Sequence, residues 1–267
     1  MDLQLEGKRA LVTGSSGGIG EGMAKALARE GATVVVHGRN EERANRVAGE
    51  IEASGGKSIV ALGDVSTDEG AHRVLERVLS GLGDLDILVN NAGDWGTTDW
   101  WETAPEVWLR LYNNDVVSAV RMIQGFAPRM RELGWGRIIQ ISSAAATQPF
   151  ANSAHYTASK AALMNITVSL AKALAETGIT VNTVSPGLVV IPKMEQVFRG
   201  VAEQRGWGSD WETIERRALR EMVPNPAGRS GYPEDVAALV AFLASPLAGF
   251  VNGANLRVDG GTVGSIN

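Results

Sequence analysis

The 267-residue sequence contains no cysteine and only three histidines, His37, His72 and His155. The lack of cysteine excludes disulfides, thiolate metal sites and cysteine nucleophiles. With so few imidazoles, a histidine-rich metal site is not expected either. The sequence also lacks an uncharged apolar run of about 18 residues, the length that predicts a membrane-spanning helix. We therefore expect neither a metal nor a membrane partner.

Positive charge is in deficit. The chain has 25 lysines and arginines against 30 aspartates and glutamates, a net charge of -5, and the basic residues are interspersed with acidic ones. A nucleic-acid surface needs clustered basic residues, so no nucleic-acid partner is expected. Residues 1–8 contain neither the basic nor the apolar segment of a secretion signal, which favours a cytoplasmic location.

Short β-rich runs alternate with longer helical patterns along the sequence. The runs that predict strands are 9–13, 33–37, 58–62, 85–89, 137–141, 179–184 and 255–258. The patterns that predict helices include 20–30, 41–53, 68–82, 105–133 and 155–177. Such alternation is typical of βαβ units. We expect a single α/β domain over residues 1–267, a Rossmann-type doubly wound parallel sheet of about seven strands with helices on both faces.

Residues 188–226 interrupt this regular pattern. They follow the sixth predicted strand and combine prolines and glycines with two short helical patterns. In an open α/β sheet, an insertion at the carboxyl end of a strand overhangs the ligand crevice. We therefore expect this segment to form a mobile lid over the substrate.

A glycine-rich turn joins the first predicted strand to the first predicted helix. It reads Thr13-Gly-Ser-Ser-Gly-Gly-Ile-Gly20. Glycines permit a tight turn and close backbone approach, and the free N–H groups of a helix N-terminus bind a pyrophosphate. The position of the turn, between strand and helix, indicates a nucleotide-binding site.

The end of the second predicted strand favours NADP(H) over NAD(H). The dinucleotide fingerprint expects a carboxylate for the ribose of NAD about 20 residues after the glycines. This chain has Gly38, Arg39 and Asn40 in that region. Gly38 leaves space, and the guanidinium of Arg39 suits charge-assisted hydrogen bonds to a 2'-phosphate. In the alternative interpretation, Arg39 is a solvated surface residue and Gly38 tolerates either cofactor.

Tyr156 and Lys160 are four residues apart in a predicted helix, which places both side chains on one face, a single turn apart. A neighbouring cation favours the phenolate form of a tyrosine, and this suits general acid/base work on an alcohol or a carbonyl. The same spacing also occurs by chance in amphipathic helices. A serine pair, Ser142 and Ser143, ends the preceding apolar run.

Together these motifs resemble the short-chain dehydrogenase/reductase family, of the 3-oxoacyl-reductase-like kind, over essentially the whole chain. The shared elements, in order, are Thr13-Gly14-x-x-x-Gly18-Ile19-Gly20, Asn90-Asn91-Ala92-Gly93, Ser143, Tyr156-x-x-x-Lys160 and Pro186-Gly187. The resemblance implies that Tyr156 is the acid in carbonyl reduction and the base in alcohol oxidation. It implies that Lys160 assists Tyr156 and holds the nicotinamide ribose, and that Ser143 binds the substrate oxygen. It also implies a homo-oligomer, either a dimer or a tetramer.

The resemblance further implies which residues contact the cofactor. They are Gly14, Ser16, Gly18, Ile19, Gly20, Gly38, Arg39, Asn40, Asp64, Val65, Asn90, Ala92, Gly93, Tyr156, Lys160, Pro186, Gly187 and Val189. For Asn90, for Asp64 with Val65 and for Pro186 with Gly187, the alternative is an ordinary turn at the end of a strand.

Two positions depart from the family pattern. The family's fourth catalytic residue is an asparagine, but Asp115 takes its position here and Asn114 comes one residue early. Adjacent helical residues point about 100° apart, so Asn114 cannot simply replace it. A carboxylate still accepts hydrogen bonds from water and from Lys160, which keeps Asp115 as a catalytic candidate. Ile191 stands where the family often has a threonine that binds the cofactor carboxamide, so nicotinamide binding must rely on backbone groups.

Seven tryptophans suggest an apolar substrate pocket. Trp95, Trp100 and Trp101 follow the Asn-Asn-Ala-Gly motif, and Trp207 and Trp211 lie in the predicted lid. Aromatic walls suit a bulky or apolar carbonyl compound. Equally, these tryptophans can pack loops or a subunit interface.

The candidate substrate contacts are Trp95, Gln148 and Phe150, whereas His155 is expected to be structural. Our leading hypothesis is an NADP(H)-dependent carbonyl reductase or alcohol dehydrogenase acting on a small molecule, such as a bulky ketone or a 3-oxoacyl compound. A polyol or sugar dehydrogenase would have a more polar pocket. A nucleotide-binding regulatory protein without turnover is the alternative of another class, and the intact Ser143, Tyr156 and Lys160 argue against it.

Overall fold

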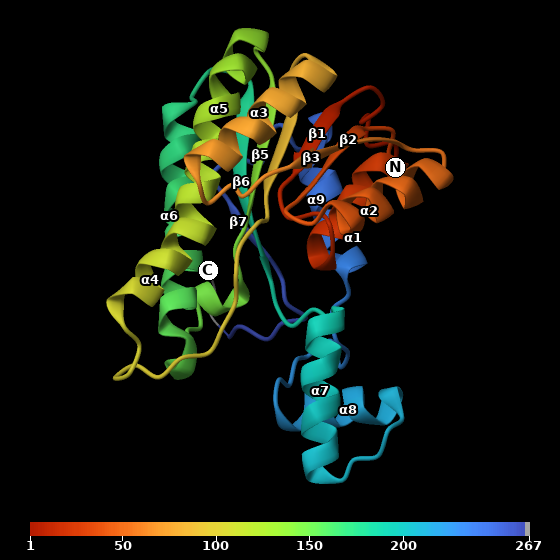
Figure 1. Ribbon diagram of the computed structural model, residues 1–267, viewed down its shortest axis with the longest axis vertical. Helices are drawn as coiled ribbons and strands as arrows, with labels where there is room; N and C mark the ends of the chain where they lie inside the picture. The colour runs from red at the N-terminus through yellow and green to blue at the C-terminus, as the bar shows by residue number, and fades with distance from the viewer. Residues whose placement is uncertain (265–267) are drawn as a thin grey trace.

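A seven-stranded parallel sheet forms the centre of the molecule, with the strand order β3-β2-β1-β4-β5-β6-β7 (Figure 1). The structure, a computed structural model, describes residues 1–264. The strands are β1 (Arg9–Val12), β2 (Thr33–Gly38), β3 (Lys57–Leu62), β4 (Ile87–Asn90), β5 (Gly136–Ile141), β6 (Ile179–Pro186) and β7 (Asn255–Val258). All neighbouring strands run parallel. The predicted doubly wound fold is confirmed; the last three residues of the predicted domain lie outside the described range.

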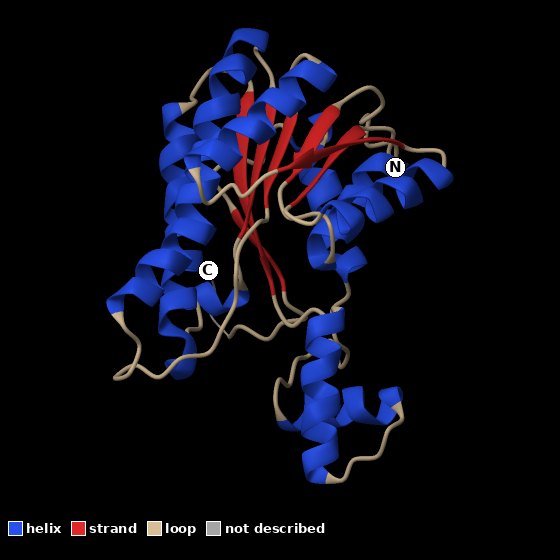
Figure 2. Ribbon diagram, viewed as in Figure 1, coloured by secondary structure: helices blue, strands red, loops and turns tan. Residues whose placement is uncertain are grey.

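Helices cover both faces of the sheet (Figure 2). One face is buried by α1 (Gly18–Arg29), α2 (Glu41–Ala53) and α9 (Pro233–Ala244). The other is buried by α3 (Asp68–Leu82), α5 (Ser118–Leu133) and α6 (Ala154–Ala173). Within β1, Leu11 packs in the second apolar cluster and Val12 in the first, and both are fully buried. Because both faces are covered, the strands need apolar residues at consecutive positions.

A π-helical turn interrupts the long helix that the sequence predicted over residues 105–133. The observed elements are α4 (Pro105–Tyr112), the π turn η1 (Asn113–Val117) and α5, which continue into one another. A π turn closes its hydrogen bonds one residue later than an α-helix does, and this changes which side chains face inward. Asp115 lies in this turn and is 1% exposed.

Other elements also differ from the sequence prediction, most of them by one or two residues at an end. Helix α9 was not predicted because residues 236–244 are all apolar and show no helical periodicity; its apolar residues are buried against α1 and the sheet. The helix predicted over 155–177 ends at Ala173, shortly before Gly178, whose φ of +74° is left-handed. Strand β4 begins at Ile87, two residues later than predicted.

Helices α7 (Pro192–Arg205) and α8 (Trp211–Glu221) project away from the sheet beyond the carboxyl end of β6 (Figure 1). They occupy most of the predicted lid segment. The buried side chains of this pair form an apolar cluster of their own, made of Phe198, Ala202, Trp207, Ile214 and Ala218. The pair is therefore held together by its own packing.

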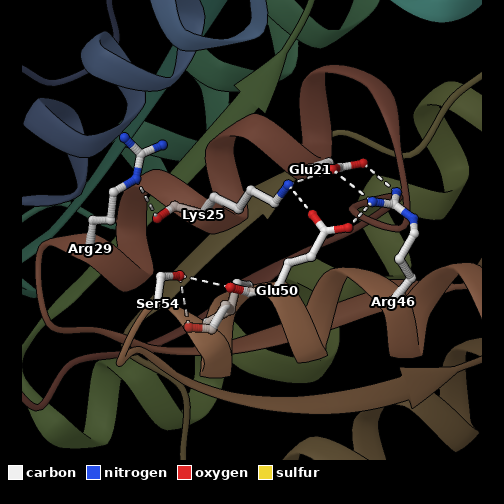
Figure 3. Close-up of polar contacts among 7 residues, drawn as sticks. Glu21, Lys25, Arg29, Arg46, Glu50 and Ser54 are labelled. Atoms are coloured by element: carbon white, nitrogen blue, oxygen red, sulfur yellow. Dashed lines mark hydrogen bonds and ion pairs between the residues drawn. The ribbon is translucent and has the colours of Figure 1, made fainter.

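Four charged side chains join α1 to α2, the helices that precede and follow β2 in the chain (Figure 3). Lys25 Nζ lies 2.6 Å from Glu21 Oε1 and 2.5 Å from Glu50 Oε2. Arg46 lies 2.7 Å from each of the same two carboxylates. Both carboxyl pKa values are lowered, mainly by the hydrogen bond from Arg46 for Glu21 and by the one from Lys25 for Glu50. This network fixes the first helix, and with it the glycine turn, against the second.

The described residues contain neither a membrane-spanning helix nor a cluster of metal ligands. Within residues 1–264, no helix has the length and apolar character needed to cross a membrane. Over the same range, no three histidine, aspartate or glutamate side chains come together as ligands for a metal ion.

Candidate active site

The sheet changes its direction of winding between β1 and β4, which are neighbours. In doubly wound sheets, ligands bind in the crevice at the carboxyl ends of such strands. A cavity of about 230 Å³ lies there. It is lined by Gly14, Ser16, His37, Gly38, Arg39, Gly63, Asp64, Val65, Ser66, Ala92, Gly93, Asp94 and Asn114. Eight of these are residues that the sequence predicted as cofactor contacts.

The glycine turn between β1 and α1 fits a bound pyrophosphate. Gly14 has a φ of +69°, in the left-handed region that favours glycine. A Cβ on Gly20 would lie 2.5 Å from the carbonyl oxygen of Gly14, so this crossing also needs glycine. Gly17 precedes α1 and has no side chain to bond the first N–H groups of the helix. Those donors and the helix dipole suit an anionic phosphate group.

The end of β2 leaves a guanidinium at one side of the cavity. A Cβ on Gly38 would lie 2.5 Å from Ser16 Oγ, so a larger residue would push the glycine turn. The Arg39 side chain is 77% exposed, and its Nη1 atom lies 3.6 Å from Asp64 Oδ2. An ion pair this exposed is weak. Arg39 is therefore free to exchange the carboxylate for a phosphate group.

His37, which the sequence analysis gave no role, lines the cavity between the glycine turn and the end of β3. Its Nδ1 atom accepts a hydrogen bond from the Gly14 N–H at 2.9 Å, and its Nε2 atom lies 3.1 Å from the Gly63 carbonyl oxygen. Burial lowers the pKa of His37 to about 4, and only 2% of the residue is exposed. The imidazole is neutral in the folded protein at pH 7.

This pKa makes the stability of the fold depend on pH. In the unfolded chain His37 takes up a proton near pH 6.5, whereas the folded protein resists it down to about pH 4. The unfolded state therefore holds more protons between these values, and stability falls as the pH is lowered from 6.5 to 4. We expect wild type to lose about 2 kcal/mol of unfolding free energy between pH 7 and pH 5 through this group alone. Urea unfolding checks this, and the loss should shrink in His37→Asn; an equal loss in that variant would contradict the assignment.

Several predicted cofactor contacts lie outside the cavity lining. The side-chain oxygen of Asn40 accepts a hydrogen bond from the Arg43 N–H at 2.9 Å and so caps α2. Asn90 is buried at the end of β4. Val189 forms an isolated β-bridge with Gly231. These positions shape the frame around the cavity.

Pro186 ends β6, and the backbone that follows it returns towards the glycine turn. A Cβ on Gly187 would lie 2.7 Å from the Asp259 Cα atom, so only glycine fits between β6 and the chain after β7. The side chain of Ile191 is the nearest group to the position that a Cβ on Gly18 would take, at 3.7 Å. The start of the predicted lid therefore lies next to the first residue of α1.

Helix α6 carries Tyr156 and Lys160 on one face. Lys160 Nζ lies 5.7 Å from the centroid of the Tyr156 ring and donates a hydrogen bond to the Ile141 carbonyl oxygen at 3.3 Å. The Ser142 hydroxyl donates to the Lys160 carbonyl oxygen at 2.8 Å. These two bonds tie the helix to the carboxyl end of β5, and they explain why Ser142 is buried.

Ser143 follows at the end of β5 with its hydroxyl partly exposed. Its Oγ atom accepts a hydrogen bond from the Ala145 N–H at 3.1 Å. A hydroxyl that accepts from the backbone still has its proton to donate. Ser143 can therefore act as a hydrogen-bond donor to an oxygen atom of a ligand.

Asp115 is buried behind Lys160. Its Oδ2 atom lies 3.7 Å from Lys160 Nζ and accepts a hydrogen bond from the Ser159 hydroxyl at 2.7 Å. Its Oδ1 atom accepts from the Asp94 N–H at 2.8 Å. Asn114, one residue earlier, lines the cavity instead. The two neighbours thus face different sides, as their helical spacing predicted. The contacts from Ser159 and Asp94 could not be predicted from the sequence pattern.

Gly93 closes this arrangement from the β4 side. A Cβ there would lie 2.8 Å from Asp115 Oδ1 and 3.1 Å from Lys160 Nζ. The Asn-Asn-Ala-Gly segment must therefore end in glycine for the carboxylate and the ammonium to approach. The geometry brings one phenol, one ammonium and one carboxylate together beside the cavity that Gly93 lines.

The predicted substrate residues are exposed. Trp95 is 38% exposed, and Lys193 Nζ from the start of α7 lies 5.3 Å from its ring centroid. Phe150 is 52% exposed, and Gln148 is exposed as well.

Other aromatic side chains lie in packing contacts, whereas Trp101 is 93% exposed. His155 is buried, with its Nδ1 atom 3.2 Å from the Thr98 hydroxyl and its ring 5.9 Å from that of Trp108. Trp100 packs on Trp108 at 5.4 Å. Trp207 belongs to the apolar cluster of α7 and α8. Trp207 and Trp211 therefore pack within their own segment, which is the second of the two interpretations that the sequence left open for the tryptophans.

Comparisons with known proteins agree with this geometry. The family profile that matches residues 14–263 is described as enoyl-(acyl carrier protein) reductase. The chain is 36% identical to the uncharacterized oxidoreductase YvaG of Bacillus subtilis over 100% of both chains. It resembles the structure of L-sorbose reductase from Gluconobacter frateurii complexed with NADPH and L-sorbose, with 35% identity, a TM-score of 0.94 and full coverage of both chains.

A third similarity is to a 7α-hydroxysteroid dehydrogenase solved with NADH and 7-oxo glycochenodeoxycholic acid. The identity is 33% and the TM-score 0.86, over 100% of this chain and 98% of that one. The profile match and the full-length relatives cover almost the entire chain. This protein belongs to the short-chain dehydrogenase/reductase family, whose enzymes are oxidoreductases that act on CH–OH and C=O groups.

Proposed function

We propose that this protein is an NADP(H)-dependent reductase of carbonyl compounds, or dehydrogenase of the corresponding secondary alcohols. The observation that carries the proposal is the arrangement of Tyr156, Lys160 and Ser143 at the carboxyl edge of the sheet, beside a cavity shaped for a dinucleotide. When bound, the cofactor supplies or accepts the hydride. The glycine turn would hold its pyrophosphate, and Arg39 its 2'-phosphate.

The proton chemistry belongs to three side chains. Ser143 donates a hydrogen bond to the substrate oxygen and orients it towards the Tyr156 hydroxyl. In reduction Tyr156 gives its proton to that oxygen, and in oxidation it takes the proton back. Lys160 keeps a positive charge near the phenol, which stabilises the phenolate left after proton transfer.

Asp115 acts in this scheme through Lys160. Its carboxylate accepts hydrogen bonds from Ser159 and Asp94 and pairs with the ammonium at 3.7 Å. This pairing fixes where the Lys160 head group lies. The negative charge also offsets part of the field that Lys160 exerts on Tyr156. The carboxylate therefore takes the place of the family's asparagine as the group behind the lysine.

The exposed Trp95, Phe150 and Gln148 favour a bulky or apolar ketone or a 3-oxoacyl compound as substrate. A polyol or sugar is the second candidate. It is favoured by the 35% identity and the TM-score of 0.94 to the L-sorbose reductase. A regulatory protein without turnover is the least supported, because Ser143, Tyr156 and Lys160 are all present.

We also infer that residues 188–226 form a lid over the substrate. Ile191 lies beside the glycine turn and Lys193 over Trp95, so the first residues of this segment touch both the cofactor end and the substrate end of the site. A cytoplasmic homo-oligomer, dimer or tetramer, remains our proposal for the working state of the protein.

A panel of ketones, 3-oxoacyl thioesters, ketoses and the matching alcohols, assayed with both cofactors, tests the proposal. We expect turnover of at least one carbonyl class, and a Kd for NADPH at least about tenfold below that for NADH, because a charge-assisted hydrogen bond is worth about 1.5–3 kcal/mol. Fluorescence titration gives both affinities. Equal affinities would refute the role of Arg39, and no turnover with any compound would favour the regulatory alternative.

The matched substitutions for this experiment are Arg39→Ala and Arg73→Ala. Arg39→Ala should remove the preference by weakening NADPH alone. Arg73 lies on α3 in a surface ion pair with Glu69, outside the cavity lining, and its substitution should change neither affinity.

A further inference from the structure

We propose that His37 is a positioning residue for the cofactor: its side chain ties the glycine turn after β1 to the end of β3 and so sets the width of the nucleotide cavity. The inference rests on the nucleotide-binding function proposed above. His37 lines the cavity and bonds the glycine turn, and it takes no part in the hydride or proton transfer.

The glycine turn is held on two sides. On the β4 side, the Asn91 side chain donates to the Thr13 carbonyl oxygen at 2.9 Å, and the Thr13 hydroxyl oxygen accepts from the Asn91 N–H at 2.9 Å. On the β2 side, the His37 N–H donates to the Ser15 hydroxyl oxygen at 2.9 Å, and the His37 carbonyl oxygen accepts from the Ser16 N–H at 3.2 Å. The turn is therefore clamped between β2 and β4.

The imidazole of His37 adds contacts that the backbone cannot make. One ring nitrogen meets the Gly14 N–H at 2.9 Å and the other the Gly63 carbonyl oxygen at 3.1 Å. Gly14 and Gly63 both line the cavity, and Asp64 follows directly. Gly63 packs closely against α3, because a Cβ there would lie 2.5 Å from the Gly70 carbonyl oxygen. The ring thus spans the floor of the cavity between two tightly packed turns.

The two hydrogen-bond partners, the Gly14 N–H and the Gly63 carbonyl, determine the tautomer of the His37 ring. A backbone N–H only donates and a carbonyl only accepts, so Nδ1 must accept and Nε2 must donate. One neutral tautomer satisfies both partners. An aliphatic side chain of similar size would leave a buried donor and a buried acceptor without partners, and each would then pull its turn towards another group or water.

This role predicts an effect distinct from that of Arg39. Arg39 faces the part of the cofactor that differs between NADP(H) and NAD(H). His37 acts on the glycine turn, which both cofactors share. A change at His37 should therefore weaken both cofactors by the same factor and leave the preference between them intact.

The test compares His37→Leu, His37→Asn and His37→Gln in the full-length protein. An asparagine oxygen can take the place of Nδ1 and keep the bond to Gly14, whereas a glutamine amide can reach Gly63. For His37→Leu we expect the Kd values of NADPH and NADH, from fluorescence titration, to rise together by about tenfold or more. The kcat at saturating cofactor should stay within about threefold of wild type, since His37 touches no reacting group. Asn and Gln should each restore part of the affinity.

The matched control is His72→Leu, because the His72 side chain lies on α3 and is 70% exposed; its substitution should change neither Kd. If wild type binds neither nucleotide, the proposed function itself is wrong. If wild type binds NADPH and the folded His37→Leu variant binds it equally well, the positioning role is overturned while the function stands. Should His37→Leu fail to fold, the Asn and Gln variants decide, and wild-type affinity in both would overturn the proposal.

Discussion

Replacing Tyr156 with phenylalanine is expected to lower kcat by about 1000-fold while the protein still binds its cofactor. Phenylalanine keeps the ring beside Lys160, whose Nζ atom lies 5.7 Å from the ring centroid, so the packing of α6 should survive. What is lost is the hydroxyl that exchanges a proton with the substrate oxygen. Steady-state kinetics with the best substrate of the panel measures the loss, and fluorescence titration with NADPH measures the retained binding.

Tyr112→Phe is the control for this experiment. Tyr112 ends α4 and is 45% exposed, away from the cavity lining, and its substitution should leave kcat unchanged. Wild-type turnover in Tyr156→Phe would show that another group transfers the proton. Loss of NADPH binding in the same variant would indicate a damaged fold in place of a missing acid.

The second large effect is expected at Asp115. Substitution by leucine should cost about 3–5 kcal/mol of unfolding free energy, because it leaves a buried cation without its partner. The side chain of Lys160 is 7% exposed and that of Asp115 is 0% exposed. The Ser159 hydroxyl and the Asp94 N–H would also lose their acceptor. Urea unfolding at pH 7.5 gives the difference; a cost below about 1 kcal/mol would mean that Lys160 needs no carboxylate.

Asp115→Asn separates the charge from the shape. The amide oxygen can keep the bond from the Asp94 N–H, so the variant should fold. Removing the negative charge behind Lys160 strengthens the positive field on the phenol. The pH profile of alcohol oxidation should therefore move to lower pH, whereas it should not move in Asp68→Asn, whose side chain is 92% exposed. An unmoved profile in Asp115→Asn would exclude the carboxylate from the proton chemistry.

Much of the fold followed from local patterns. The alternation of strands and helices predicted the parallel sheet. The helix in each βαβ unit returns the chain to the end of the sheet where the previous strand began, so the next strand runs in the same direction. Helix α9 was not predicted from such a pattern. Its residues from Val236 to Ala244 are all apolar, so nothing in their order distinguishes one helical face from another. Only burial between α1 and the sheet explains the composition.

At the site, too, the surroundings of two residues, Asp115 and His37, could not be predicted from local sequence patterns. The spacing of Tyr156 and Lys160 is visible in sequence because one turn of helix decides it. The surroundings of Asp115 depend on a π turn, which leaves no clear signature in the sequence, and on an N–H group from a distant loop. In the sequence, nothing distinguishes His37 from the other residues of a buried strand. Its two partners come from positions 23 residues before it and 26 after it.

The tryptophans mark where composition misleads. Their number suggested either an aromatic pocket or packing, and Trp211 in α8 and Trp207 in the connection before it pack in one cluster with Phe198 of α7. The side chains that make up this cluster, buried and partly buried, all come from residues 188–218. Substitutions among the buried side chains from Phe198 to Ala218 can thus accumulate without repacking the sheet that supports Tyr156 and Lys160. In evolutionary terms, the internal packing of the proposed lid can change while the packing of the sheet is kept.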